Sequence, residues 1–399
     1  MTDARKLLLT RAIRGLADGV VSIALASYLT HLGFSALEVG AIVTGTLLGS
    51  AAVTLTVGLL GYRLSRRRVL LGASVLMALT GLGFAGFSDF WPLMIVAVAG
   101  TLNPSSGDVS VFLPTEQAAL AHTVGGPART MTFAWYSLVG SLAGAAGALL
   151  TGVPALAASQ WGVPLLRAER GVFVLYAACA VLAAVVYTRL SPALEVHPDK
   201  RAGAPLAQSR AIVIRLAALF SVDSFGGGFV VQSLLVLWLH KRFALDGATI
   251  AAVFFAAGTL AAFSQVLSPR VAARIGLVRT MVYTHLPANL LLVLAALMPT
   301  APLAITCLLL RMAVSQMDVP ARQAFVMAIV PPEERAAAAS VTNVPRSLAA
   351  GLAPLIAGAL LERTSFGWPL IIGGALKAAY DIALLVQFRA VATREDGVR

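Results

Sequence analysis

Twelve long apolar stretches, each near the length that crosses a bilayer, divide this chain of 399 residues. A spanning α-helix needs about 20 predominantly apolar residues. Alternating strands of about ten residues, which mark a membrane β-barrel, are absent from the sequence. We therefore predict an all-α membrane protein with twelve transmembrane helices. Their expected ranges are 11–31, 38–61, 69–88, 91–114, 129–152, 171–190, 212–239, 248–268, 280–299, 302–330, 335–361 and 368–390.

The chain also repeats itself at a constant offset of 206 residues. The matched pairs are Pro114 and Pro320, Gln117 and Gln323, Arg129 and Arg335, and Ser141 and Ser347. Each of these residue types carries a geometric or polar requirement, so the matches are not a by-product of apolar composition. Duplication in a very hydrophobic chain predicts a transporter whose two halves move about a central site.

A polar connector at 191–210 separates the two copies, with three prolines and charges of both signs. This composition is typical of a solvated linker. We expect an N-terminal half at 1–190 and a C-terminal half at 211–399, each with six helices. An even number of spans gives the two pseudo-symmetric halves the same orientation in the membrane.

The net charge of +12 comes from Lys and Arg residues whose positions agree with the predicted order of helices and loops. Most Lys and Arg residues lie in loops on the side of the N-terminus, which is the positive-inside bias. We therefore expect a multi-pass protein of a bacterial inner membrane, with both termini cytoplasmic and the lipid bilayer as its surroundings. Base-reading motifs are missing, so we expect no nucleic-acid partner, and we expect a monomer.

The sequence gives no indication of an enzyme. Cys179 and Cys307 fall in different predicted helices, and the five histidines are scattered without metal-ligand spacing. A Walker loop for ATP is also missing from the sequence. We expect no catalytic residues, no bound metal and no cofactor.

The loop between the second and third stretches carries a motif. Gly58, Arg63, Arg66 and Arg67 fit the pattern Gly-x-x-x-Asp-Arg-x-Gly-Arg-Arg, although Tyr62 replaces its acid. With twelve helices in two halves, the chain resembles the major facilitator superfamily of transporters. The resemblance implies that fold, and it implies a gating role for these four residues. The alternative is a basic loop that only sets topology.

A second resemblance concerns the direction of transport. Gly140, Gly144 and Gly147 are similar to a glycine-rich stretch of bacterial drug and solute efflux members, although Ala145 stands where those have proline. Close helix packing explains the same spacing. The stretch favours export.

Charged residues inside the predicted helices are the strongest indication of function. A charge at mid-bilayer costs about 3 to over 10 kcal/mol, so charges that are present usually face a cavity. We expect substrate binding or proton coupling from seven residues, namely Arg14, Asp18, Asp108, Asp223, Arg311, Asp318 and Arg346.

The first helix of each half carries an acid, Asp18 or Asp223. Arg14 lies one turn before Asp18, so the two predict either a tunable proton-coupling pair or a snorkelling pair. Asp223 has no cation nearby in sequence, and three glycines at 226–228 predict a loosened helix near a binding site.

The roles of the other charged residues are predicted from their residue types and spacing. Arg311 has the donor fork that clamps a carboxylate or phosphate, or it pairs with a buried acid. Lys377 and Asp381 are four apart on one helix, and we expect a structural pair. At the inner gate, Glu116 is expected to latch with Arg129, and Arg335 is expected to act equivalently, unless these residues are repeated structural caps.

The hypothesis from sequence is a proton-coupled secondary transporter that exports a small molecule by alternating access. One alternative is an uptake symporter for a small organic anion, which Arg311 suggests. Another, from a different class, is a membrane sensor on the same fold that transports nothing.

Overall fold

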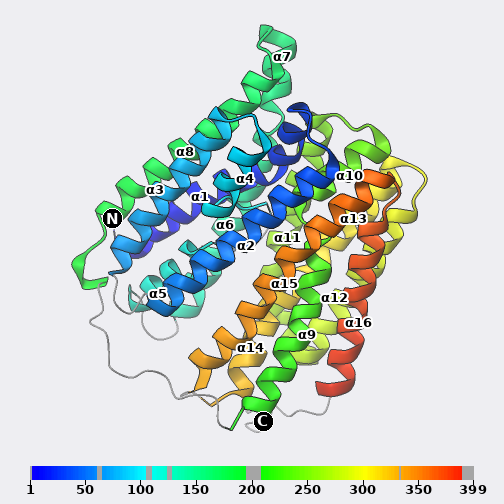
Figure 1. Ribbon diagram of the computed structural model, residues 1–399. Helices are drawn as coiled ribbons and strands as arrows, with labels where there is room; N and C mark the ends of the chain where they lie inside the picture. Colours follow the sequence, from blue (N-terminus) through cyan, green and yellow to red (C-terminus); the bar gives the residue numbers. More distant parts are fainter. Residues whose placement is uncertain are drawn as a thin grey trace. The chain divides into compact units, whose positions relative to one another are not determined.

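Every regular element that the computed structural model describes is helical (Figure 1). The described residues are 2–60, 65–104, 110–123, 128–194, 208–331 and 334–388. Among them, eleven helical segments are long and apolar enough to span a membrane, and Phe90–Ala99 is a shorter apolar helix. These twelve correspond in order to the twelve predicted stretches, so the prediction of an all-α membrane protein is confirmed.

The described helices follow in chain order. They are α1 (Asp3–His31), α2 (Ala36–Leu60), α3 (Arg66–Gly86), α4 (Phe90–Ala99), α5 (Phe112–Thr123), α6 (Ala128–Leu150), α7 (Val153–Trp161), α8 (Leu165–Thr188), the 3₁₀ turn η2 (Pro192–Leu194), α9 (Arg210–Gly228), α10 (Gln232–Phe243), α11 (Gly247–Ile275), α12 (Leu277–Leu297), α13 (Ala301–Ser315), α14 (Asp318–Ile329), α15 (Arg335–Arg363) and α16 (Trp368–Phe388).

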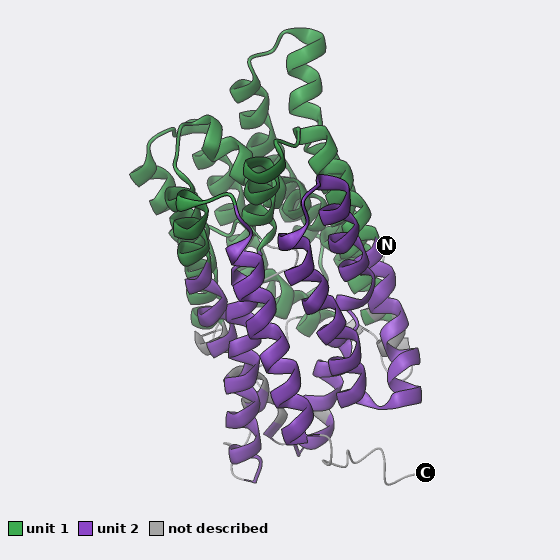
Figure 2. Cartoon of the chain, turned by 90° about the vertical axis from the view of Figure 1, so that its right-hand side faces the viewer, with its two compact units in different colours: residues 1–198, 231–259, 354–365 green, residues 199–230, 260–353, 366–399 purple. Residues whose placement is uncertain are grey.

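The chain forms two compact units (Figure 2). Unit 1 comprises residues 1–198, 231–259 and 354–365, and unit 2 comprises residues 199–230, 260–353 and 366–399. Unit 1 therefore includes α10, the start of α11 and the end of α15 in addition to the first eight helices. The division into sequence halves around 191–210 stays a prediction.

In unit 1, α1 packs closely on α6 through glycines. A β-carbon at Gly19 would overlap the carbonyl oxygen of Gly144, and one at Gly147 would overlap that of Leu16. The helices approach this closely because neither side contributes a side chain there. This contact supports close packing as the reason for the glycine-rich stretch.

In unit 2, apolar side chains of α9, α12, α14 and α16 form a buried core. Phe220, Met281, Phe325, Tyr380 and Leu384 are each no more than 1% exposed. Phe220 lies one turn before Asp223 on α9, so the core supports the helix that carries the central carboxylate.

Two long spans are interrupted in the middle. The glycines at 226–228 remain within α9, which ends at Gly228, and α10 begins at Gln232. The interruption thus follows the glycines, whereas the sequence predicted loosening at them. A β-carbon at Gly228 would overlap the carbonyl oxygen of Ala350, so this glycine permits close packing on α15. The second interruption, between Ser315 and Asp318, separates α13 from α14.

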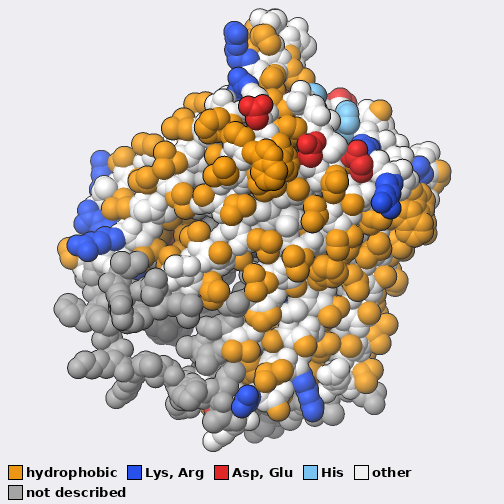
Figure 3. Space-filling view, in the orientation of Figure 1, with side chains coloured by type: hydrophobic (Ala, Val, Ile, Leu, Met, Phe, Trp, Pro, Cys, Tyr) orange, Lys and Arg blue, Asp and Glu red, His pale blue; other side chains and the backbone are white. Residues whose placement is uncertain are grey.

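Large apolar side chains lie exposed along the spans. Trp91 is 72% exposed, Ile95 67% and Val386 68%. Hydrophobic side chains are also widespread over the described face in Figure 3. Soluble proteins rarely expose so much contiguous apolar surface, and a lipid environment accounts for it.

Candidate functional site

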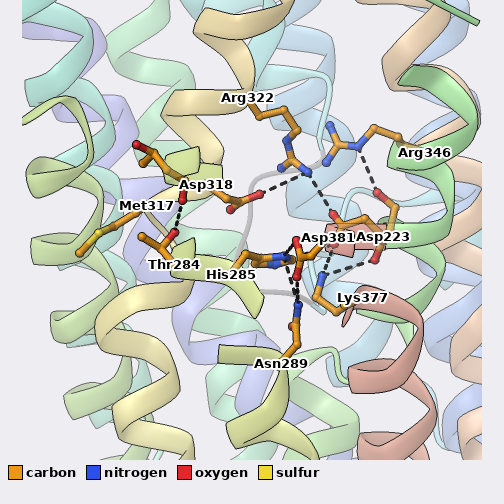
Figure 4. Close-up of polar contacts among 12 residues, drawn as sticks. Asp223, Thr284, His285, Asn289, Met317, Asp318, Arg322, Arg346, Lys377 and Asp381 are labelled. Atoms are coloured by element: carbon orange, nitrogen blue, oxygen red, sulfur yellow. Dashed lines mark hydrogen bonds and ion pairs between the residues drawn. The ribbon is translucent and has the colours of Figure 1, made fainter. Parts of the chain in front are cut away.

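Asp223 on α9 is the centre of a buried ion-pair cluster in unit 2 (Figure 4). The residue is 4% exposed. Lys377 Nζ of α16 lies 2.6 Å from its Oδ1, and Arg322 Nη1 of α14 lies 3.0 Å from its Oδ2. The acid that has no neighbouring cation in sequence therefore has two in space, because three helices converge on it.

His285 on α12 bridges Asp223 to a second buried carboxylate. Its Nε2 lies 3.9 Å from Asp223 Oδ1, and its Nδ1 lies 2.9 Å from Asp381 Oδ1. Asn289 donates from Nδ2 to Asp381 Oδ2 at 2.8 Å. The imidazole thus has a carboxylate on each side (Figure 4).

Arg322 extends the cluster along α14. Its Nη1 lies 3.6 Å from Asp318 Oδ2, one turn earlier on the helix. Its guanidinium also lies over the Phe220 ring, with Cζ 5.5 Å from the ring centroid, a contact that stabilises a desolvated cation. We refer to the ion-paired residues as the Asp223 cluster. Its members are Asp223, His285, Asp318, Arg322, Lys377 and Asp381.

The ion-paired members of the Asp223 cluster include three carboxylates and two permanent cations, Arg322 and Lys377. A third permanent cation, Arg346, interacts electrostatically with Asp223 and Asp318. The carboxylates and the permanent cations are therefore equal in number, and His285 is the additional ionisable side chain between two of the carboxylates.

Arg346 on α15 lies beside this cluster. Its Nε donates to Ser224 Oγ at 3.1 Å, and its Nη1 donates to Asn343 Oδ1 at 3.2 Å. Its Cζ lies 5.9 Å from the centroid of the Phe220 ring that Arg322 also contacts. The structure therefore brings together three of the predicted residues, Asp223, Asp318 and Arg346.

The predicted pairing of Lys377 with Asp381 is wrong. Lys377 reaches Asp223, whereas Asp381 bonds to His285 and Asn289. Spacing of four residues placed both on one helix of unit 2, but helices α9 and α12 each supply a closer partner. Both residues belong to the candidate site and do not form the structural pair that their spacing predicted.

Unit 1 contains a separate buried charge, Glu116 on α5. Arg14 Nη2 of α1 lies 2.5 Å from its Oε2. Thr10, Tyr136 and Tyr187 also donate to this carboxylate. Glu116 is completely buried. It was expected to latch with Arg129, whose side chain lies outside the described residues, and the structure gives it Arg14 as its ion-pair partner.

Arg14 and Asp18 both lie on α1, as expected, but differ in burial. Arg14 is 1% exposed and places its Cζ 4.4 Å from the Phe112 ring centroid. Asp18 is partly exposed. The ion pair of Arg14 with Glu116 is a contact that the sequence did not indicate, since 102 residues separate the two.

Arg311 on α13 has donor capacity left over. Its Nε is buried without a hydrogen-bond partner among the described residues. Its Nη1 lies 3.4 Å from the sulfur of Met312, a weak acceptor. A guanidinium with an unused buried donor can donate to an anionic oxygen of a ligand.

The predicted gating residues are described only in part. Arg66 Nη1 donates to the Leu194 carbonyl at 3.3 Å, and Arg67 Nη2 donates to the Thr188 carbonyl at 2.6 Å. Both contacts hold the start of α3 against the end of α8 and η2. Gly58 lies within α2. Arg63 and Asp108 lie outside the described residues, and so does the side chain of Arg335.

Sequence reasoning missed the roles of His285, Asn289 and Arg322 in the site. A histidine and an asparagine four residues apart within an apolar span were the available signal, since they share a helical face. Arg322 lies 206 residues after Glu116, so the repeat register pointed to it as well.

The sequence profile of the Major Facilitator Superfamily matches residues 7–317. The uncharacterized membrane protein YJR124C of Saccharomyces cerevisiae is 26% identical over 416 residues, which cover 95% of this chain and 92% of the yeast protein. The name of that relative specifies neither a substrate nor a direction. The resemblance to bacterial drug efflux members therefore stays a prediction.

Solved transporter structures share the fold. The nucleoside transporter NupG has a TM-score of 0.72 at 13% identity, covering 98% of this chain and 100% of that chain. The D-xylose-proton symporter has a TM-score of 0.75 at 14% identity, covering 95% and 96%. The human organic anion transporter MFSD10 has a TM-score of 0.66 at 18% identity, covering 96% and 98%. At such identities the likeness concerns the fold alone.

Proposed function

Since this chain belongs to the Major Facilitator Superfamily, a family of multi-pass secondary transporters, we propose that it couples a small-molecule substrate to protons and exports it by alternating access. Family membership makes it a membrane transport protein with a small-molecule substrate, not an enzyme. Proton coupling, export and a bacterial inner membrane are the further content of the proposal.

The observation that carries proton coupling is the bridge from Asp223 through His285 to Asp381. One imidazole nitrogen is 3.9 Å from the first carboxylate and the other is 2.9 Å from the second. A proton held at His285 can pass to either acid over such distances, given small side-chain movements. The bridge lies within the spans, where a charged group is retained mainly for function.

Coupling requires that protonation favour one conformation over the other. Lys377 and Arg322 bond to Asp223 in its ionised form. A proton on Asp223 would weaken both ion pairs, and these pairs hold α16 and α14 against α9. The same proton would thus change the packing of three helices of unit 2.

The test is transport by purified protein in liposomes with an imposed pH gradient. We expect Asp223→Asn to abolish gradient-driven flux of a substrate found in a toxicity and uptake panel. We expect Asp89→Asn, which changes an exposed aspartate ahead of α4, to leave flux unchanged. Full flux in Asp223→Asn would remove this residue from the mechanism. Absence of any flux in the wild type would favour the sensor hypothesis.

A second variant separates coupling from folding. His285→Gln removes the titratable ring and leaves both permanent cations on Asp223. We expect it to purify as a monodisperse protein and to transport without the pH dependence of the wild type. An unchanged pH profile would exclude His285 as the proton-carrying group.

Uptake of a small organic anion is the second candidate function, and Arg311 favours it. Its buried Nε has no partner among the described residues, so a bound carboxylate would supply the missing acceptor. The test is Arg311→Lys, which keeps the charge but removes the planar fork. Under this candidate the affinity for an anionic substrate falls at least tenfold, and full retention of affinity would exclude a bidentate clamp.

A further inference from the structure

Unit 1 contains a cavity of about 210 Å³ at the end of α1 opposite the N-terminus. Its walls are mainly apolar and come from α1, α8, α10 and α11. Ile23, Leu165, Val236, Leu237 and Ile250 line it. A cavity of about 150 Å³ is enough for a benzene ring, so this one has room for a ring with a short side chain.

The hydroxyl groups that line the cavity have already donated their protons. Ser27 Oγ donates to Glu169 Oε1 at 2.8 Å. Thr30 Oγ1 donates to a main-chain carbonyl one turn earlier at 2.8 Å, and Thr151 Oγ1 does so at 2.6 Å. Each hydroxyl oxygen keeps only acceptor capacity.

The two histidines that line the cavity also donate a hydrogen bond within the lining. His31 Nδ1 lies 2.9 Å from both carboxylate oxygens of Glu169, and His240 Nδ1 lies 3.1 Å from the Leu245 carbonyl. A carboxylate and a carbonyl only accept, so Nδ1 carries a hydrogen in each ring and donates it within the lining.

Two carboxylates complete the polar lining. Glu169 is 4% exposed, and its neighbour Arg170 donates to Ser88. Asp246 caps α11 by accepting from the Thr249 main-chain nitrogen at 2.9 Å and from its hydroxyl at 2.7 Å. These bonds lower the pKa of Asp246 below its usual value, so it is ionised at neutral pH.

We propose that this cavity is a binding site for a small organic cation, with a primary or secondary ammonium group on a compact apolar body. The lining contains two carboxylates, and the hydroxyl groups and the Nδ1 atoms of both imidazoles donate within it. A ligand that fits must therefore bring its own N–H donors and a positive charge. An anion of the same size would be repelled by the two carboxylates of the lining.

The site does not depend on the proposed proton coupling, because binding needs no transport cycle. It is lined by residues of unit 1, whereas the Asp223 cluster lies in unit 2. Binding and coupling are therefore tested separately, and failure of one leaves the other standing.

The test is calorimetric titration of the full chain in lipid nanodiscs at pH 7.5 with three probes of one shape. These are 2-phenylethylammonium, 2-phenylethanol and 3-phenylpropionate. We expect the ammonium to bind at least tenfold more tightly than the alcohol, because a charge-assisted hydrogen bond is the stronger kind. We expect no heat above background for the carboxylate.

Variants locate the site. We expect Glu169→Gln to weaken ammonium binding at least tenfold, because it replaces an acceptor oxygen by an N–H donor. The matched control is Glu362→Gln, which changes a carboxylate of unit 1 outside the cavity and should bind as the wild type does. If Glu169→Gln does not purify, Leu165→Trp fills the cavity from the half-buried first residue of α8 and should abolish binding. Equal binding of the ammonium and the alcohol would overturn the proposal, and so would wild-type affinity in Glu169→Gln or Leu165→Trp.

Discussion

Glu116 is a single residue on which the stability of unit 1 depends. It is completely buried, and four side chains donate to its two oxygens. Removing one partner of a buried ion pair leaves the other charge uncompensated, at a cost of about 3–5 kcal/mol. We expect Glu116→Ala to lower the free energy of unfolding by that amount, measured by denaturant unfolding in detergent.

The control for Glu116 is Asp89→Ala, an exposed position ahead of α4 whose side chain makes no capping bond. It should change stability by no more than about 0.5 kcal/mol. The double variant Arg14→Met with Glu116→Leu removes both charges and should recover most of the loss. Wild-type stability in Glu116→Ala would show that Arg14 finds another partner.

At the residue scale, the sequence identified charged positions better than it identified their partners. Asp223, Asp318 and Arg346 were predicted and do meet, whereas Lys377 was paired with Asp381 because helical spacing reveals only local neighbours. Pairing across α9, α12, α14 and α16 depends on how the helices pack, which spacing in the sequence does not show.

The 206-residue repeat also indicated a pair of equivalent ion-pair positions that the sequence reasoning did not use. Glu116 and Arg322 are 206 residues apart, and each binds the opposite charge on the first helix of its half, so the ion pair recurs with its signs reversed.

At the scale of elements, the contact of α1 with α6 gives a prediction from backbone geometry. A β-carbon at Gly19 would overlap the Gly144 carbonyl, whereas one at Gly72, exposed on α3, would meet nothing within 4 Å. We expect Gly19→Ala to destabilise the protein by about 1–3 kcal/mol, because the helices must separate. Gly72→Ala should stabilise it by about 0.5–1 kcal/mol, because alanine favours the helix. Melting temperatures of the two purified variants should move in opposite directions, and a shift of the same sign would contradict the close contact.

The positions of the spans followed from composition, since each needs only about 20 apolar residues. Interruptions inside spans were harder to predict. The glycines after Asp223 indicated a break, but α9 continues through Gly228. At Gly226 and Gly228, close neighbours on α16 and α15 occupy the space that a side chain would fill, so these glycines permit packing. The gap between Ser315 and Asp318 had no comparable signal. The low helix propensity of glycine therefore indicated roughly where the helix could be interrupted, but not the residue at which it ends.

At the scale of the whole molecule, the distribution of basic residues predicts the orientation in the membrane. Arg270, Arg274 and Arg279 lie around the connection from α11 to α12, and loops rich in Lys and Arg stay in the cytoplasm. The connection from α3 to α4 carries no basic residue and contains Asp89. The two connections should therefore lie on opposite sides of the membrane.

Single-cysteine labelling tests this orientation in intact cells. Cys179 and Cys307 are each 8% exposed, and both are first replaced by alanine to remove background. We expect Asp89→Cys to react at once with a membrane-impermeant maleimide added outside, because Asp89 is exposed and the predicted orientation places it on the outer side. We expect Arg274→Cys, also exposed, to react only after permeabilisation. The reverse pattern would mean that the basic loops face outward. The cavity for an organic cation would then open to the cytoplasm, because it lies at the end of α1 opposite the N-terminus.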